Sequence, residues 1–175
     1  KLQLSVINQL KKRPRLIVMD TMNFWMDIAM DDLKTVLKKV DVLLVNDGEA
    51  RQLSGEVSLV KAAKAIMAMG PQYLIIKKGE HGALLFHQNS VFFAPALPLE
   101  DVIDPTGAGD TFAGGFTGYL AKVKDISFDS MKTAIIVGSA MASFCVEKFG
   151  PERLKEITAD DITARINEFV QLVNF

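Results

Sequence analysis

The nine residues from Asp104 to Phe112 carry the strongest chemical pattern in the chain. The small residues Gly107, Ala108 and Gly109 stand directly before a helical pattern that begins near Asp110. Small residues let successive backbone N–H groups turn toward a common point, and a helix start adds unpaired N–H groups and the positive end of the helix dipole. The segment therefore predicts an anion hole suited to the negative charge that develops in phosphoryl transfer.

Asp110 lies in the first turn of this predicted helix, beside the anion hole. A carboxylate at that position could accept the proton of an attacking hydroxyl, acting mainly by orienting the alcohol. The alternative is that Asp110 only caps the helix, because acidic residues are common in first turns. The local pattern gives the two interpretations about equal weight.

The elements that must position these residues alternate between strand and helix. Apolar runs predict strands at 15–20, 42–46, 73–77 and 83–86, with a possible fifth at 91–93. The first three runs are apolar almost throughout, which is typical of parallel strands covered on both faces. Helical patterns between them predict βαβ units and a doubly wound, Rossmann-like α/β sheet, in one domain over residues 1–175. The third and fourth strands are too close for a helical crossover, so we expect an antiparallel hairpin.

Polar residues end the first three predicted strands: Asp20, Asn46 and the pair Lys77-Lys78. Ligands of open parallel sheets bind at these carboxyl ends. Neither GxxxxGK[ST] nor GxGxxG occurs in the sequence, so a P-loop or a dinucleotide fingerprint has no support.

Charge and composition limit the kinds of partner that this protein can bind. The net charge is −1 and the basic residues are spread along the chain, which gives no electrostatic footprint for nucleic acid or an anionic membrane. No apolar stretch approaches the ~20 residues that cross a bilayer. The lone Cys145 is interpreted as a buried core thiol, and we expect a cytoplasmic protein.

Three motifs resemble those of one enzyme family, in the same order. The segment Asp104 to Phe112, D-P-T-G-A-G-D-T-F, resembles the D-T-T-G-A-G-D-x-F signature of the ribokinase-like, or PfkB, carbohydrate kinases. Residues 46–49 are similar to the family's N-x-x-E motif, and residues 77–82 to its G-x-x-G hairpin. The resemblance covers essentially the whole chain, as the C-terminal portion of a ribokinase-type three-layer α/β/α sandwich.

The resemblance implies a role for each matching residue. Asp110 would be the catalytic base, and Gly107, Ala108 and Gly109 the anion hole. Asn46 and Glu49 would organise Mg²⁺ and phosphate through water; without the resemblance, they are interpreted as a helix-capping turn. Other positions would bind the nucleotide: Lys77, Gly79, Gly82, Thr106 and the loop glycine Gly150.

The implied cofactors are ATP and Mg²⁺. Some members also bind a monovalent cation such as K⁺ beside the anion hole, and Asp104 and Thr106 match that site. Leu154 replaces a more polar residue nearby, which weighs against the cation. Pro105 stands where the signature has Thr, and Gly138 where an Asn commonly meets the adenine.

The family's N-terminal half, with its acceptor-binding residues and β-sheet lid, has no counterpart in this sequence. We therefore expect the complete protein to be a transferase that acts on a sugar or a nucleoside. Dimerisation through the lid is common in the family, so a homodimer of the complete protein is one expectation. We expect the chain alone to be inactive. A non-catalytic ATP-binding module is the alternative, and a dehydrogenase-type domain a weaker one.

Overall fold

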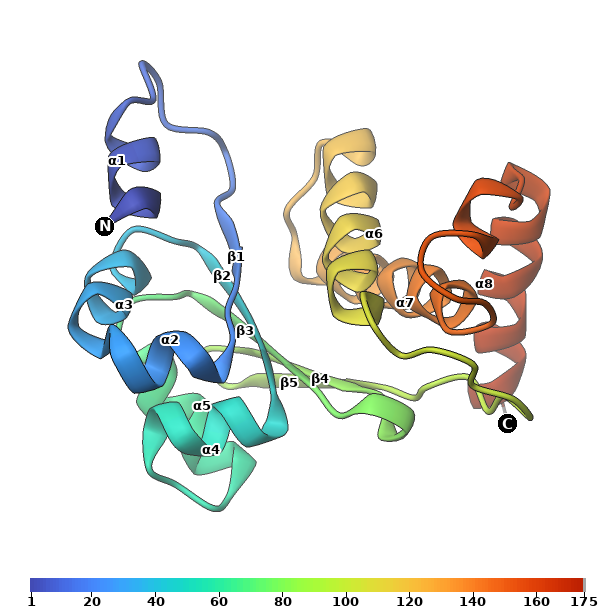
Figure 1. Ribbon diagram of the computed structural model, residues 1–175, viewed down its shortest axis with the longest axis horizontal. Helices are drawn as coiled ribbons and strands as arrows, with labels where there is room; N and C mark the ends of the chain where they lie inside the picture. Colours follow the sequence, from blue (N-terminus) through green and yellow to red (C-terminus); the bar gives the residue numbers. More distant parts are fainter. Residues whose placement is uncertain (175) are drawn as a thin grey trace. The chain divides into compact units, whose positions relative to one another are not determined.

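The computed structural model of this chain describes residues 1–174 and alternates strands and helices through its first half (Figure 1). The strands are β1 (Val18–Asp20), β2 (Val42–Asn46), β3 (Tyr73–Lys77), β4 (Ala83–His87) and β5 (Ser90–Ala94). The α-helices are α1 (Leu2–Asn8), α2 (Asn23–Ile28), α3 (Met30–Leu37), α4 (Asp47–Ser54), α5 (Leu59–Met67), α6 (Ala108–Val123), α7 (Phe128–Cys145) and α8 (Ala159–Val173). Two short 3₁₀ helices are η1 (Gly79–His81) and η2 (Arg153–Lys155).

The strands form one sheet in the order β1-β2-β3-β4-β5. β1 and β2 are parallel, with Val18 opposite Val42 and Asp20 opposite Leu44. Every residue of β2 before Asn46 is fully buried, as expected for a strand covered on both faces. Helices α2 and α3 connect β1 to β2, and helices α4 and α5 connect β2 to β3.

β1 is shorter than the strand predicted at 15–20. The side chain of Asp41 explains the difference, because it accepts the N–H of Ile17 at 2.8 Å and the guanidinium of Arg13 at 2.8 Å. The carbonyl oxygen of Ile17 still accepts the N–H groups of Asp41 and Val42, and the strand register with β2 begins at Val18.

The predicted hairpin is present, since β3 and β4 are neighbours separated by five residues that include η1. A connection this short allows only antiparallel strands. Gly82 closes the turn with φ +84°, and a Cβ there would lie 2.0 Å from the carbonyl oxygen of Ala94. A side chain is therefore excluded at Gly82 by the close approach of β5. The possible fifth strand at 91–93 is confirmed as part of β5.

Helices α6 and α7 pack closely through glycines. A Cβ at Gly138 would lie 2.8 Å from the carbonyl oxygen of Phe112, and one at Gly115 would lie 3.0 Å from the Cα of Gly138. The two backbones meet at this crossing. Gly138 therefore has a packing role here.

The chain forms two compact units. One contains residues Lys1–Ile76 and Leu85–Val91, and the other contains Lys77–Leu84 and the chain from Phe92 onward. Within residues 1–174, none of the helices has the length and apolar character needed to span a bilayer.

Candidate active site

The start of α6 has the geometry of an open helix N-terminus. Gly107 is the N-cap residue, with φ +82° and ψ −1°, a left-handed conformation that glycine adopts without strain. The N–H of Ala108 donates to Pro105 O at 3.2 Å, but those of Gly109 and Asp110 donate to no acceptor within residues 1–174. These two donors, with the positive end of a 16-residue helix behind them, can bind an anion.

Asp110 occupies the third position of α6 and is exposed. Gly107 is the N-cap residue, and across the described part of the chain the Asp110 carboxylate makes no hydrogen bond or ion pair. Asp110 is therefore not the N-cap residue of α6, although it is the acidic residue of the first turn, as the alternative interpretation expected. A carboxylate held beside two unpaired N–H groups can accept a proton or a hydroxyl hydrogen bond from a bound ligand.

The loop before α6 is organised by Asp104. One carboxylate oxygen accepts the backbone N–H of Thr106 at 2.9 Å, and the other accepts the N–H of Gly150 at 3.4 Å. Hydrogen bonds from the backbone and side chain of Thr106, and from Gly150, hold the pKa of Asp104 below its ordinary value of 3.8. Asp104 thus remains an ionised acceptor at neutral pH.

Cys145, the last residue of α7, lies against this loop. The residue is 3% exposed, and its thiol donates to the carbonyl oxygen of Thr106 at 3.7 Å. A Cβ on Gly107 would lie 3.9 Å from the same sulfur, which is ordinary van der Waals contact. The prediction of a buried core thiol is confirmed, but its contact with the anion-hole loop was not predicted.

A charged cluster fastens the chain after α7. Glu147 accepts Arg165 on one carboxylate oxygen at 2.7 Å and Arg153 on the other at 2.8 Å. Arg165 also donates to the buried hydroxyl of Ser143 at 2.7 Å, and its guanidinium lies 3.9 Å from the centroid of the Phe144 ring. These bonds join α7, η2 and α8 on both sides of Gly150. Sequence reasoning did not predict these contacts, because Glu147 and Arg165 lie 18 residues apart in the chain.

The predicted nucleotide hairpin lies in the same compact unit as α6. Gly79 has φ +55° and begins η1, while Lys78 N–H donates to Gly82 O at 2.8 Å. A hollow of about 380 Å³ borders this turn and is lined by Lys78, Glu80, His81, Phe93, Pro95 and Ala96. Lys77, at the end of β3, is half-buried. The turn is thus well formed, with an open hollow beside it.

Asn46 and Glu49 belong to the other unit and form a reciprocal capping box at the start of α4. Asn46 Oδ1 accepts the Glu49 N–H at 2.7 Å, and Glu49 Oε2 accepts the Asn46 N–H at 2.7 Å. The helix-capping interpretation is confirmed, and Glu49 is held 7% exposed at the carboxyl end of β2. Within residues 1–174 no cluster of three His, Cys, Asp or Glu side chains could hold a metal. These residues fit Mg²⁺ carried by nucleotide phosphates and water, and do not fit a protein cage.

The structure therefore brings together one group of predicted residues by direct contact, namely Asp104, Thr106, Gly107 and Gly150 with the first turn of α6. The hairpin residues Lys77, Gly79 and Gly82 form a second group, and Asn46 with Glu49 a third. Their binding roles stay predictions.

Comparisons with known proteins match the chain over most of its length. Residues 5–157 match the family described as pfkB family carbohydrate kinase. The chain is 35% identical over 121 residues to a cytidine kinase of Thermococcus kodakarensis, covering 67% of this chain and 43% of that protein. It is 31% identical over 122 residues to a ribokinase of Staphylococcus aureus, covering 67% of this chain and 38% of that protein. The chain spans less than half the length of these two relatives.

Solved structures agree on the fold. An aminoimidazole riboside kinase from Salmonella enterica, complexed with aminoimidazole riboside and an ATP analog, matches with a TM-score of 0.75 and 25% identity, over 86% of this chain and 52% of that one. A fructokinase from Vibrio cholerae matches with a TM-score of 0.82 and 19% identity, over 94% of this chain and 55% of that one. The predicted ribokinase-type α/β fold is confirmed.

Proposed function

Because this chain belongs to the pfkB carbohydrate kinase family, we propose that residues 1–175 are the nucleotide-binding part of one kinase domain. The complete enzyme transfers the γ-phosphoryl group of ATP to a hydroxyl of a sugar or a nucleoside. The observation that carries the proposal is the start of α6, where left-handed Gly107 precedes two N–H groups and the Asp110 carboxylate, all without a partner within residues 1–174.

The anion hole acts on the transferred group. Gly107 has no side chain and Ala108 has only a methyl group, so neither blocks a phosphate oxygen. The backbone N–H groups of Gly109 and Asp110 have no acceptor within residues 1–174. Their positive ends stabilise charge that grows on the equatorial oxygens as the γ-phosphoryl group leaves ADP. Preorganised donors of this kind typically contribute about 10² to 10³ in rate.

Asp110 acts on the acceptor. Its carboxylate accepts the hydrogen of the acceptor hydroxyl, whose oxygen attacks the γ-phosphorus while the bond to the β-phosphate oxygen breaks. The proton ends on Asp110 and the products are ADP and a phosphate ester. Asp110 acts mainly by orienting the hydroxyl for attack.

Magnesium bound to the nucleotide would neutralise phosphate charge and align the β- and γ-phosphates. In this chain, Asn46 and Glu49 are the residues proposed to orient the water around that ion. Their capping box holds both side chains in one geometry, which supports this role. Lys77, Gly79, Gly82, Thr106 and Gly150 are proposed to border the nucleotide.

The acceptor is a sugar or a nucleoside. Relatives at similar identity include the cytidine kinase and the ribokinase, which act on one class each by name. We propose that the 175-residue chain alone binds ATP with little turnover, because the family's acceptor-binding residues lie in an N-terminal half. Robust ADP release by the isolated chain in the presence of a sugar or nucleoside would contradict this.

The test is Asp110→Asn in the complete enzyme, assayed for ADP release against a panel of sugars and nucleosides. We expect kcat to fall about 10²-fold or more, with ATP affinity by calorimetry within about threefold of wild type. Asp160→Asn is the matched control, because Asp160 is an exposed carboxylate in the first turn of α8. Turnover of Asp110→Asn within a few-fold of wild type would refute the role of Asp110. ATP binding without turnover of any acceptor by the complete wild-type protein would favour a non-catalytic ATP-binding module.

A further inference from the structure

The loop that precedes α6 is fastened to the end of α7 by backbone hydrogen bonds. The N–H groups of Ile103 and Asp104 both donate to Val146 O, at 2.8 and 3.3 Å. Val146 is the C-cap residue of α7, and its carbonyl oxygen has two donors from the protein itself. The first part of the loop is therefore attached to the end of a helix with no intervening ligand.

The Asp104 carboxylate makes a second attachment. Its Oδ1 accepts Thr106 N–H within the loop, and its Oδ2 accepts the N–H of Gly150 from the loop after α7. Gly150 has φ +54°, a left-handed conformation. The loop before α6 and the loop after α7 are thus joined through one carboxylate.

The Thr106 carbonyl makes a third attachment. It accepts the thiol of Cys145 at 3.7 Å, and this thiol is buried. A thiol donates a hydrogen and is a poor ligand for a hard cation, which prefers oxygen. The thiol therefore occupies the side of the Thr106 carbonyl that faces α7.

These contacts involve the oxygens that the family resemblance assigns to a monovalent cation. Such a cation needs a shell of oxygen ligands that replaces its water. Here each oxygen of Asp104 and the carbonyl of Thr106 accepts one hydrogen and keeps one lone pair, whereas Val146 O accepts two hydrogens. Both oxygens of nearby Glu147 are paired with arginines. Leu154, in η2, offers an apolar side chain. Among the side chains around the loop, only Asp104 keeps oxygen capacity for a cation, so the residues present fit a full cation shell poorly.

We infer that Asp104 is a positioning residue that joins the anion-hole loop directly to the Gly150 loop, in place of a monovalent cation. As a consequence, which rests on the proposed function, phosphoryl transfer by the complete enzyme does not require K⁺. Hydrogen bonds from the backbone N–H groups of Thr106 and Gly150 hold the carboxylate in place.

The test compares thermal unfolding of the 175-residue chain in 150 mM potassium chloride and in 150 mM tetramethylammonium chloride, whose cation is too large for a protein oxygen shell. For a site with a Kd for K⁺ near 1.5 mM, this K⁺ concentration is about 100 times the Kd, and binding would raise Tm by about 5–10 °C. We expect the two Tm values to agree within about 1 °C. A Tm higher in potassium by about 5 °C or more would overturn the inference.

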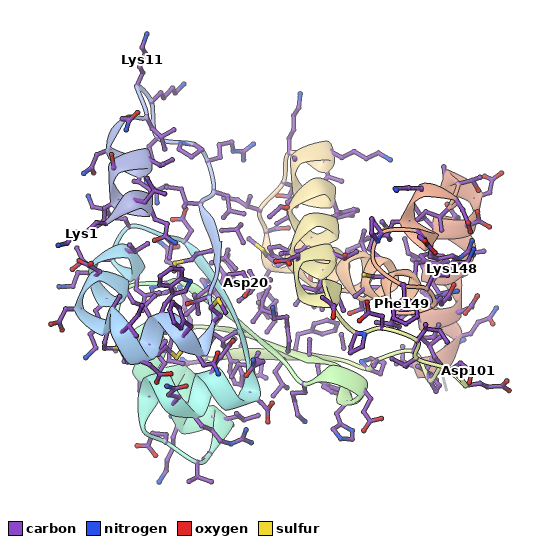
Figure 2. The ribbon with its side chains drawn as sticks, in the orientation of Figure 1. Lys1, Lys11, Asp20, Asp101, Lys148 and Phe149 are labelled. Carbon is purple, nitrogen blue, oxygen red and sulfur yellow. The ribbon has the colours of Figure 1, made fainter. Side chains whose placement is uncertain are left out.

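Asp104→Asn tests the attachment itself, because it removes the charge and one of the two acceptor oxygens. We expect its Tm to fall by a few degrees, equally in both salts. Asp101→Asn is the control, since Asp101 is an exposed carboxylate three residues earlier (Figure 2). An Asp104→Asn variant as stable as Asp101→Asn would show that the Asp104 carboxylate does not stabilise the contact between the loop before α6 and the Gly150 loop. If Asp104→Asn does not fold, the wild-type comparison decides alone.

The activity of the complete enzyme gives an independent measurement. We expect kcat/KM in potassium and in tetramethylammonium to agree within about twofold, and activation by K⁺ of about tenfold or more would overturn the inference while leaving the kinase proposal intact. Absence of turnover in every salt would refute the kinase proposal instead, and the Tm comparison would still decide whether the chain binds K⁺.

Discussion

Adding one methyl group at the crossing of α6 and α7 should destabilise the chain. In Gly138→Ala the new Cβ would lie 2.8 Å from the carbonyl oxygen of Phe112 and 3.3 Å from its ring. The closest atom belongs to helix backbone, so no flexible side chain can simply move away. The two helices must separate by a few tenths of an ångström, and that separation disturbs the packing of fully buried Phe116 and Ala134.

The size of the effect follows from two opposing contributions. Replacing glycine by alanine inside a helix stabilises it by about 0.5–1 kcal/mol, because alanine loses less backbone entropy on folding. Overpacking a rigid core costs about 1–3 kcal/mol. Gly118→Ala isolates the first contribution, since a Cβ at that exposed position of α6 meets nothing within 4 Å. We therefore expect Gly138→Ala to be about 1–3 kcal/mol less stable than Gly118→Ala.

Urea unfolding followed by circular dichroism measures the difference. Gly118→Ala should have a higher midpoint than wild type and Gly138→Ala a lower midpoint than Gly118→Ala, with equal slopes for all three. A Gly138→Ala variant as stable as Gly118→Ala would refute the close approach of the two backbones. A changed slope would instead indicate a different compactness of the native or unfolded state.

Three further predictions concern stability. Asn46→Ala should lose about 1 kcal/mol of unfolding free energy, because the capping box of α4 loses its acceptor, whereas Asn46→Asp should retain most of it; urea midpoints compare the two. Arg165→Met keeps the aliphatic stem but leaves Glu147 and the Ser143 hydroxyl each without one donor, so the unfolding free energy in urea should fall by about 2–3 kcal/mol. Removing the side chain of Lys148 (labelled in Figure 2), which pairs with Glu156 at the surface, should lower it by under about 1 kcal/mol. Burial raises the pKa of Glu147, but hydrogen bonds and charges from Arg165 and Arg153 outweigh it and leave that pKa below the ordinary 4.5. The stability from this carboxylate is present above pH 4.5 and is lost as pH falls through the lower, folded-state pKa, so Tm should fall more steeply below that pH in wild type than in Glu147→Gln.

Local signals in the sequence predicted most of the elements. The apolar runs at 42–46 and 73–77 gave bounds for β2 and β3 that the structure confirms. Each of these depends on neighbouring residues only. The start of β1 was wrong because Asp41, distant in the sequence, takes the N–H of Ile17.

In the candidate site, too, features that depend on neighbouring residues were predicted, and contacts between distant residues were not. Gly107 before a helix start is a local pattern, and the structure gives that glycine a left-handed conformation at the N-cap. The contacts of Asp104 with Gly150 and of Cys145 with Thr106 join residues 46 and 39 positions apart. Their sequence neighbours carry no sign of the pairing, which depends on how α7 returns beside the loop. Catalysis by Asp110 stays a prediction until the variant is measured.

The path of the chain through its two compact units limits how the protein can be dissected. The chain passes from one unit to the other after Ile76, Leu84 and Val91, so neither unit is a continuous segment. A truncation at any of these points leaves one unit without a strand or without its hairpin. A single proteolytic cut cannot release either unit intact, and a gene fusion or a circular permutation that aims to isolate the unit containing α6 must carry residues 77–84 with it.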